Sequence, residues 1–235
     1  MSNGFQFKQF FIRHDNCAMK VNTDGILLGA VAHIENCRQV LDLGTGSGLI
    51  AIMLAQRTAE NCHITALEVE PNAYLQAVEN AQNSAYRNRI TVIQGDVMTQ
   101  QFAQKFDLIV SNPPYFQDSL AARTQERDLA RSVISSSHLD WLVQAKKWLA
   151  ENGRISLILP TTAAEKLITQ SQPLGLHCIE QWQIFTKAGK TAKRSIVSFG
   201  LHPQQCEQRA LVIYDFNNQY TPEFKTLTQD FYLNF

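Results

Sequence analysis

A run of alternating glycines constrains the fold of this chain most strongly. The apolar stretch 39–43 leads into Gly44, Gly46 and Gly48, and the apolar stretch 49–57 follows directly. A strand that passes through a glycine turn into a helix brings backbone N–H groups together at the helix N-terminus, where they bind a ligand rich in acceptors. Gly44 permits the tight turn, Gly46 permits close approach of the ligand, and Gly48 permits the helix to pack on the strand. The spacing is G-x-G-x-G, which differs from the G-x-G-x-x-G of dinucleotide enzymes.

The chain after this motif alternates strand-like and helix-like stretches, which favours an α/β fold with a mostly parallel sheet. The expected strands are 39–43, 63–69, 90–94, 106–111 and 154–159, and the expected helices are 49–57, 72–84, 139–151 and 161–172. After Gly175, strand-like stretches follow one another and predict an antiparallel edge: 176–186, 194–201 and 210–215. Upstream, Thr23 or Asp24 is suited to cap an apolar helix. With no repeat or dividing linker, we expect one domain over residues 1–235.

The composition excludes several function classes. Lys+Arg and Asp+Glu balance at 21 each, so an RNA ligand would have to bind a local basic patch. The five cysteines are scattered without a C-x-x-C pair, which predicts reduced thiols and no zinc site. The chain starts without the layout of a signal peptide, and its longest apolar run, 25–32, is too short to cross a membrane. We therefore expect a cytoplasmic protein that uses no metal and no membrane.

Acidic residues follow the second and third predicted strands. Glu68 lies about twenty residues beyond the glycine motif, where a carboxylate at the adjacent strand end accepts hydrogen bonds from ribose hydroxyls. Glu70 competes for this role, but it precedes Pro71 at the start of a helix, so we prefer Glu68. Asp96 follows the third strand and could accept the exocyclic amine of an adenine. The glycine motif, Glu68 and Asp96 follow three successive strands, and together they predict a nucleoside cofactor.

The fourth strand, 106–111, runs into the sequence Asn112-Pro113-Pro114-Tyr115. The two prolines remove backbone donors and restrict the chain. The side-chain oxygen of Asn112 and the carbonyl of Pro113 can then accept the two hydrogens of one amine, while Tyr115 stacks on its planar group. Two acceptors favour the pyramidal nitrogen whose lone pair is free to attack a methyl group. The motif is typical of methyltransferases that act on a conjugated nitrogen.

Two clusters of basic residues are candidates for RNA contact. The first lies in a Gly-containing loop without acids, between two late strands, and comprises Lys187, Lys190, Lys193 and Arg194. Such lysines would neutralise phosphates, although a solvated hairpin loop has the same composition. The second follows the N-P-P-Y motif and comprises Arg123, Arg127 and Arg131. Because Glu126 and Asp128 lie among these arginines, internal salt bridges are an equal alternative. We expect the polar segment 117–137 to form a lid that orders when substrate binds.

The first twenty residues mix aromatic and basic side chains. The aromatic residues are Phe5, Phe7, Phe10 and Phe11. Aromatic rings among basic residues can stack bases and contact phosphates, which makes Lys8 and Arg13 further candidates for RNA contact. The alternative, weighed equally, is that the phenylalanines cover the edge of the core.

Together, the glycine motif, Glu68, Asp96 and the N-P-P-Y motif resemble class I S-adenosylmethionine-dependent methyltransferases that act on an exocyclic or amide nitrogen. The segments MKVNTDGILLGA, at 19–30, and YTPEFKTLTQDFYL, at 220–233, are more specific. They resemble the bacterial tRNA methyltransferases that make N6-methyladenine in valine tRNA, next to the anticodon on its 3′ side. The resemblance extends over nearly the whole chain.

This resemblance implies a Rossmann-like, seven-stranded sheet with its last strand antiparallel, S-adenosylmethionine as the cofactor and tRNA as the partner. It implies cofactor contacts from Asp42, Gly44, Gly46, Gly48, Glu68, Asp96 and Asn112. It places Thr23 and Asp24 in an N-terminal segment, 1–38, that closes over the cofactor and contacts the substrate, ahead of the core at 39–235. It implies base binding and catalysis by Asn112, Pro113, Pro114 and Tyr115.

Other functions remain open at this point. An N5-glutamine methyltransferase acting on a protein uses the same N-P-P-Y motif, but such enzymes carry a sizeable helical substrate domain ahead of the glycine motif. In this chain only about 39 residues precede that motif, which favours RNA. Ribosomal RNA or DNA adenines are chemically equivalent targets. A non-catalytic RNA-binding protein of the same fold predicts erosion of the motifs, which are intact. No obligate protein partner is evident.

Overall fold

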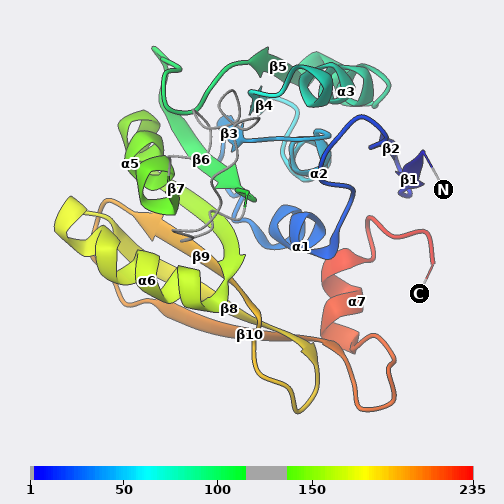
Figure 1. Cartoon of the computed structure of the whole chain (residues 1–235), viewed down its shortest axis with the longest axis vertical. Coiled ribbons are helices and arrows are strands. Elements are labelled where there is room, and N and C mark those ends of the chain that lie inside the picture. Colours follow the sequence, from blue (N-terminus) through cyan, green and yellow to red (C-terminus); the bar gives the residue numbers. More distant parts are fainter. Residues whose placement is uncertain (1–2, 115–136, 235) are drawn as a thin grey trace, which may run out of the picture.

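The computed structural model describes residues 3–114 and 137–234, and its centre is one eight-stranded sheet (Figure 1). The strands are β3 (Gln39–Leu43), β4 (His63–Glu68), β5 (Ile90–Gln94), β6 (Phe106–Ser111), β7 (Leu149–Pro160), β8 (His177–Lys187), β9 (Arg194–Gly200) and β10 (Glu207–Tyr214). Their order is β10-β8-β9-β7-β6-β3-β4-β5. A separate antiparallel hairpin is formed by β1 (Gly4–Gln6) and β2 (Phe11–Arg13).

The strand directions confirm the α/β class I fold and correct two details. The strands from β3 to β7 are mutually parallel, β9 is antiparallel to both β7 and β8, and β10 is parallel to β8. Within the described residues the sheet has eight strands, which match the eight strand-like stretches of the sequence and exceed by one the number that the resemblance implied, and its antiparallel strand, β9, lies inside the sheet. The burial of the strands explains this order. Residues 195–200 of β9 are buried, whereas β10 begins with exposed residues that suit an open edge.

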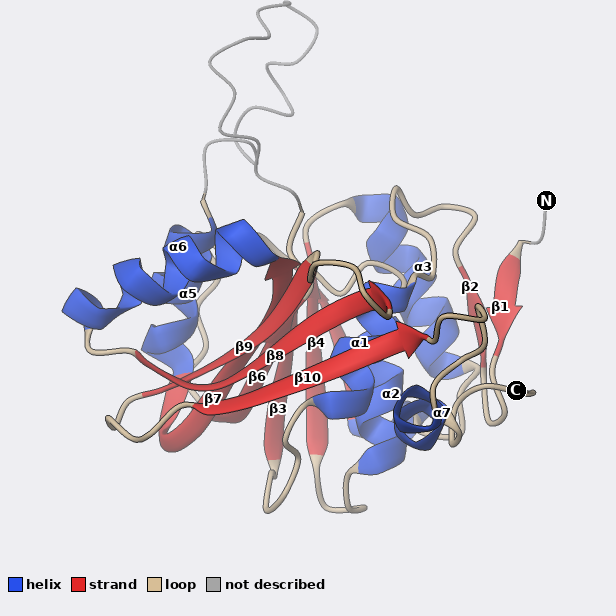
Figure 2. Cartoon of the chain, turned by 90° about the horizontal axis from the view of Figure 1, so that it is seen from below, coloured by secondary structure: helices blue, strands red, loops and turns tan. Residues whose placement is uncertain are grey.

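Helices cover both faces of the sheet. They are α1 (Thr23–Val31), α2 (Leu49–Arg57), α3 (Pro71–Gln82), α5 (His138–Trp148), α6 (Thr161–Ser171) and α7 (Pro222–Thr228), with 3-10 turns at Arg87–Arg89 and Gln172–Leu174. Figure 2 shows α5 and α6 on one side of the sheet and α1, α2 and α7 on the other. Alternate strand residues supply the two cores: Val40 packs in the α1–α2 core, and Leu41 packs in the α5–α6 core.

Most predicted element boundaries agree with the structure, and the exceptions have local causes. The bounds expected for β3, α2, β5 and β6 are confirmed, and those of the other predicted elements shift by one to three residues except at the start of β7. Helix α5 ends at Trp148, and β7 begins at Leu149, which already pairs with Phe106 of β6, so β7 starts five residues earlier than predicted. The cap of α1 is Asn22, whose Oδ1 accepts from the Gly25 amide at 2.9 Å, and not Thr23 or Asp24.

The N-terminal hairpin and the C-terminal tail lie side by side (Figure 1). Phe7 and Phe10 are buried and pack with Phe5 and Tyr232, which supports the core alternative for these phenylalanines. Lys8 bonds the tail through its amide and its Nζ atom, which donates to the Gln229 carbonyl at 2.6 Å. All five cysteines are free thiols. Within residues 3–114 and 137–234, no helix is long and apolar enough to cross a membrane.

Candidate active site

A cavity of about 520 Å³ opens at the carboxyl edge of the sheet, where the ends of β3, β4, β5 and β6 meet. This volume lies in the range of sites for small molecules and cofactors. Opposite the strand ends, the segment 16–22 forms a second wall. Among the predicted site residues, those that line the cavity are Gly44, Gly46, Glu68, Asp96, Asn112 and Pro114.

The glycine loop wraps around the end of β4. The amides of Gly44 and Thr45 both donate to the Leu67 carbonyl, at 2.9 and 3.0 Å. Gly44 and Gly46 have φ values of +67° and +57°, which side chains rarely adopt. A Cβ on Gly46 would meet no atom within 4 Å and would project into the cavity. The missing side chain therefore leaves room for a ligand close to the backbone.

Glu68 holds this loop in place and also lines the cavity. Its Oε2 atom accepts from the Gly46 amide at 2.8 Å, and its Oε1 atom accepts from the amides of Val69 and Glu70, each at 2.9 Å. A carboxylate has about four acceptor positions, so one remains for a ligand hydroxyl. Glu70 caps α3 by accepting from the Ala73 amide at 2.7 Å, as its place before Pro71 predicted.

Asp42 supports the glycine loop from behind and does not line the cavity. Its carboxylate is fully buried, and its Oδ2 accepts from the Thr45 hydroxyl at 2.5 Å. The pKa of the Asp42 carboxyl is raised from 3.8 to about 7, mainly by burial and in smaller part by the nearby charge of Glu68, while hydrogen bonds from Thr45 and the Ala51 backbone act in the opposite direction. Gly48 also stays outside the cavity; it begins α2 with a φ of +81°.

Asp96 lies at the cavity wall after β5. Its Oδ1 accepts from the Met98 amide at 2.8 Å, so the side chain shapes the turn that follows the strand. Only one of its two carboxylate oxygens is used in this way among the described residues, and the other can serve a ligand. Asp96 thus stabilises the turn after β5 and also lines the cavity.

Asn112 lies at the cavity wall because β6 is tied to β3. The Ser111 hydroxyl donates to the Leu43 carbonyl at 2.7 Å, which aligns the two strand ends. The Asn112 Nδ2 atom lies 3.8 Å from the Met19 sulfur, and within the described residues its Oδ1 atom accepts no hydrogen bond. This oxygen is an available acceptor. Pro113 is buried beneath the motif, and Tyr115 lies outside the described residues.

The wall formed by residues 16–22 is attached to α3. The Gln76 Oε1 atom accepts from the Asn16 amide at 3.3 Å, and the Asn80 side chain bonds the Arg13 backbone. Cys17 lies in this wall, and burial together with Glu68 and Glu70 raises the pKa of its thiol to about 11. The segment 1–38, which contains this wall, was expected to close over the cofactor, but the residues singled out in it, Thr23 and Asp24, do not line the cavity.

Trp141 is a site residue that the sequence reasoning missed. It is buried on α5, lines the cavity, and would lie 3.0 Å from a Cβ on Gly44. Its helix begins at a capping box in which Ser137 and Asp140 bond each other's backbone amides. That sequence signal marks the start of α5, but only the tertiary structure brings the indole ring to the glycine loop.

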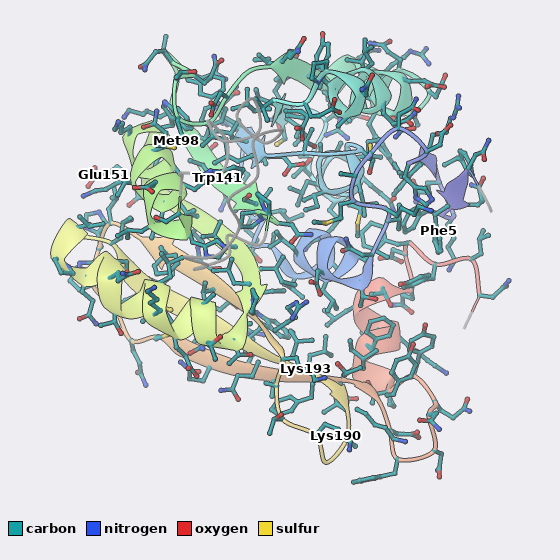
Figure 3. All side chains as sticks on the ribbon, in the orientation of Figure 1. Phe5, Met98, Trp141, Glu151, Lys190 and Lys193 are labelled. Atoms are coloured by element: carbon teal, nitrogen blue, oxygen red, sulfur yellow. The ribbon has the colours of Figure 1, made fainter. Side chains whose placement is uncertain are left out.

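The predicted RNA contacts lie in different environments. Lys190 and Lys193 are exposed on the β8–β9 hairpin, with Lys190 near its tip (Figure 3). Lys187, in the same hairpin, donates to Asn218 at 2.7 Å. The Arg194 guanidinium pairs with Asp24 at 2.8 Å, and Arg13 pairs with Asp15 and Glu79. Arg123 and the expected lid 117–137, apart from Ser137, lie outside the described residues.

The hairpin lies at the same edge of the sheet as the cavity. The amide and hydroxyl of Thr161, the first residue after β7, donate to the carbonyls of Lys193 and Ala192, at 3.3 and 3.1 Å. The Arg194–Asp24 pair connects the hairpin to the first turn of α1, next to Asn22 in the cavity wall. Among the described residues, no group of three His, Cys, Asp or Glu side chains is placed to hold a metal ion.

Comparison with known proteins decides the family. Residues 22–171 match the methyltransferase small domain family. The chain belongs to this family. This methyltransferase is 66% identical, over 99% of its length, to a protein of Actinobacillus pleuropneumoniae serotype 7 named tRNA1(Val) (adenine(37)-N6)-methyltransferase, of which 98% is covered. A protein of the same name from Haemophilus influenzae strain PittEE is 52% identical over 99% of this chain and 100% of its own length. The resemblance predicted from the motifs is confirmed.

Solved structures show the same fold. A predicted O-methyltransferase from Agrobacterium tumefaciens, protein Atu636, has a TM-score of 0.69 at 23% identity, over 88% of this chain and 96% of its own. The glycopeptide N-methyltransferase MtfA in complex with (S)-adenosyl-L-methionine has a TM-score of 0.57 at 12% identity, over 78% of this chain and 89% of its own. At these identities the likeness concerns the fold alone.

Proposed function

We propose that this methyltransferase transfers a methyl group from S-adenosylmethionine to the N6 amine of adenine 37, in the anticodon loop of a valine tRNA, in the cytoplasm. The observation that carries the proposal is the position of Asn112. Its Oδ1 atom, which accepts no hydrogen bond from the described residues, lies on the wall of the cavity that begins at the glycine loop. Relatives that match nearly the whole chain bear the name of this activity.

The cavity has the features that S-adenosylmethionine requires. The open space at Gly46 admits a ligand against the loop backbone, and the buried Glu68 keeps one acceptor position for a ribose hydroxyl. Asp96 is placed to accept from the adenine amine, with apolar surface from Val97 and Trp141 nearby. When bound, S-adenosylmethionine supplies an electrophilic methyl group on a positively charged sulfur. We assign Gly44, Gly46, Glu68 and Asp96 to its binding, with Asp42 and Gly48 supporting the loop.

Asn112 activates the target amine by accepting from it. The lone pair of an adenine amine is delocalised into the ring, so the nitrogen is a weak nucleophile. Acceptance of its two hydrogens by the Asn112 side chain and the Pro113 carbonyl favours the pyramidal geometry in which the lone pair points toward the methyl group. Stacking of Tyr115 on the base stays a prediction. No strong general base is needed, because the proton becomes acidic only as the new N–C bond forms.

The target adenine has to leave the stack of the anticodon loop to reach this acceptor. Its extrusion costs least in a single-stranded loop, where the base has no pairing partner. We propose that the whole chain, 1–235, acts as one methyltransferase domain, with the segment 1–38 closing the cofactor side. The wall 16–22 and its bonds to α3 support that role.

Glutamine methylation of a protein is the second candidate, because the chemistry of Asn112 fits an amide equally well. Two observations favour RNA. The relatives are named as tRNA methyltransferases, and the exposed Lys190 and Lys193 lie at the edge of the sheet that carries the cavity. Methylation of an adenine in ribosomal RNA or DNA would use the same acceptors, so a substrate assay has to distinguish these targets from tRNA.

The test is a methyl-transfer assay with labelled S-adenosylmethionine and three substrates in parallel: total tRNA, ribosomal RNA and soluble protein. We expect label in tRNA as N6-methyladenosine, located at position 37 of valine tRNA after nuclease mapping. Label in protein as methylglutamine would replace this function by the amide reaction. Label in ribosomal RNA alone would keep the chemistry and refute the tRNA substrate.

A further inference from the structure

The turn between β10 and α7 exposes an aromatic ring beside the basic hairpin. Phe216 is 73% exposed, the highest value among the large hydrophobic side chains in the described part of the chain. An isolated exposed phenylalanine is unremarkable in itself, but this ring occupies a defined position against Gly189, in the hairpin that carries Lys187, Lys190 and Lys193. Figure 1 shows the two loops next to each other below the sheet.

Gly189 makes room for the ring. A Cβ at this position would lie 3.2 Å from the Phe216 Cε1 atom and 3.8 Å from its Cζ atom. The first distance is shorter than most Cβ contacts in proteins. Gly189 also has a φ of +76°, which favours glycine independently. The ring therefore packs against the bare backbone of Gly189, and most of its surface stays exposed to a ligand.

The turn that carries Phe216 is held by hydrogen bonds on both sides of the ring. The Asp215 Oδ1 atom accepts from the amides of Asn217 and Gln219, at 2.8 and 2.9 Å. The Ala188 amide donates to the Tyr214 carbonyl at 2.8 Å, and the Lys187 Nζ atom donates to Asn218 at 2.7 Å. The backbone that carries the ring is thus preorganised, which lowers the entropy lost when a ligand binds there.

The charges around the ring suit a polyanion. Residues 187–194 include four basic residues and no acid. The acid of the neighbouring turn, Asp215, has its Oδ1 atom engaged by two backbone amides. Lys190 and Lys193 are exposed on the hairpin (Figure 3). An aromatic face among cations is the arrangement that binds single-stranded nucleic acid, because bases stack on the ring while lysines contact phosphates.

We infer that Phe216 and the 187–193 hairpin form a stacking platform for an unpaired base of the RNA substrate, outside the catalytic cavity. The inference rests on the proposed function and adds to it a second contact with the RNA. The hairpin is joined to the cavity edge by Thr161 and by the Arg194–Asp24 pair. A base next to the extruded adenine, or one further along the same single strand, stacks on Phe216 while its phosphates meet Lys190 and Lys193.

The test measures binding of an anticodon stem-loop RNA from valine tRNA to the full chain and to Phe216→Ala. We expect F216A to weaken binding about fivefold to a hundredfold, which is the usual loss when an aromatic side chain that stacks on one base is replaced by alanine. The slope of log affinity against log salt should not change, because no phosphate contact is lost. Phe216→Trp should retain affinity, and its added indole fluorescence should be quenched by the RNA. Leu75→Ala, which removes another exposed apolar side chain, on α3, is the matched control.

The outcomes separate the platform from the proposed function. Methylation of tRNA by the wild type with equal RNA affinity for F216A would refute the platform alone. Failure of the wild type to bind or methylate tRNA would refute the function. The platform is then tested with a single-stranded oligouridine, where equal affinity of the wild type and F216A would also refute it. Concentration-dependent dimerisation that F216A abolishes would show that a second copy covers the ring, and would overturn the inference.

Discussion

The Nδ2 atom of Asn80 donates to the carbonyl oxygen of Ser47 in the glycine loop, at 2.8 Å. The same amide bonds the backbone of Arg13, donating to its carbonyl at 2.8 Å and accepting from its N–H at 2.9 Å. A single buried side chain of α3 thus connects the loop on one side of the cavity with the segment that leads to the other wall. The geometry of the cavity depends on this connection.

We expect Asn80→Ala to lower both stability and cofactor affinity. The substitution removes the hydrogen-bond partner of the buried Ser47 carbonyl and of two partly buried backbone groups of Arg13, which costs about 1–3 kcal/mol in free energy of unfolding. Because the loop and the N-terminal segment lose their common anchor, the Kd for S-adenosylmethionine should rise severalfold. Denaturant unfolding and calorimetry measure the two effects. Asn83→Ala, an exposed change at the end of the same helix, should alter neither. Unchanged cofactor affinity in N80A would contradict the anchoring role.

Asn112→Ala is expected to abolish methylation while leaving the cofactor bound. The change removes an acceptor used by the substrate amine in the transition state, and loss of one such preorganised group lowers kcat about a hundredfold or more. Single-turnover kinetics measure the rate, and equilibrium dialysis measures the cofactor Kd. A parallel loss of cofactor affinity would show that Asn112 belongs to the cofactor site and not to the substrate site.

Gly46→Ala is expected to weaken cofactor binding more than it weakens folding. Its added methyl group meets no protein atom but occupies the space beside the loop, and its positive φ costs about 1–2 kcal/mol. Gly175→Ala imposes a similar left-handed conformation, at φ +65°, away from the cavity. The two variants should unfold at similar denaturant concentrations, but only G46A should lose affinity for S-adenosylmethionine. Equal affinities in the two variants would mean that the cofactor does not approach Gly46.

Because the pKa of Asp42 is raised in the folded state, we expect the stability of the cofactor-free protein to depend on pH. This pKa is raised from 3.8 to about 7, so between these values the folded chain keeps a proton that the unfolded chain has lost. The folded state binds more protons, and the free energy of unfolding therefore falls as pH rises from about 4 to 7, by up to about 1.4 kcal/mol per pH unit. Unfolding curves of the wild type and Asp42→Asn across this range test it. The asparagine variant should lack this contribution, and identical slopes would refute it.

Neutralisation of the hairpin should change the salt dependence of RNA binding. We expect the combined substitutions Lys187→Gln, Lys190→Gln and Lys193→Gln to weaken binding and to reduce the slope of log affinity against log salt, by about 0.7 to 0.9 for each phosphate contact removed. Filter binding at several salt concentrations measures the slope. Lys105→Gln, on the loop before β6 at the opposite edge of the sheet, is the control. An unchanged slope in the triple variant would place the RNA elsewhere.

The fold could be predicted where the sequence signal is local. The glycine motif sits between two apolar runs whose lengths suit one strand and one helix, so β3 and α2 were predicted to the residue. Pro71 marked the start of α3, and the cluster of acids and prolines at strand ends predicted the edge where the cavity lies. These signals depend on backbone conformation and hydrophobic period, both of which a short stretch of sequence contains.

The remaining features depend on contacts between distant segments. The β1–β2 hairpin is short and is held by aromatic packing on Tyr232 at the other end of the chain. The Arg194–Asp24 pair joins residues 170 positions apart. Trp141 reaches the glycine loop only because α5 packs across the sheet. Neither hydrophobic period nor residue propensity reveals such partners, so the sequence could not predict that the Arg194 guanidinium is engaged by a carboxylate of α1. The RNA contact of Arg194 stays a prediction.

The position of β10 has a consequence for the behaviour of the protein at high concentration. Among the described residues, β10 pairs with no strand other than β8; near its end Tyr214 bridges Tyr220 and the Ile213 carbonyl accepts from the Thr221 amide, so the start of β10 is the part left open at the rim of the sheet. Such rims invite the addition of strands from other molecules, which leads to aggregation. Here the rim begins with Glu207, Gln208 and Arg209, and Arg209 is paired with Glu180 and Glu207. Charge at the start of the outermost strand thus opposes the addition of strands from other molecules to the sheet.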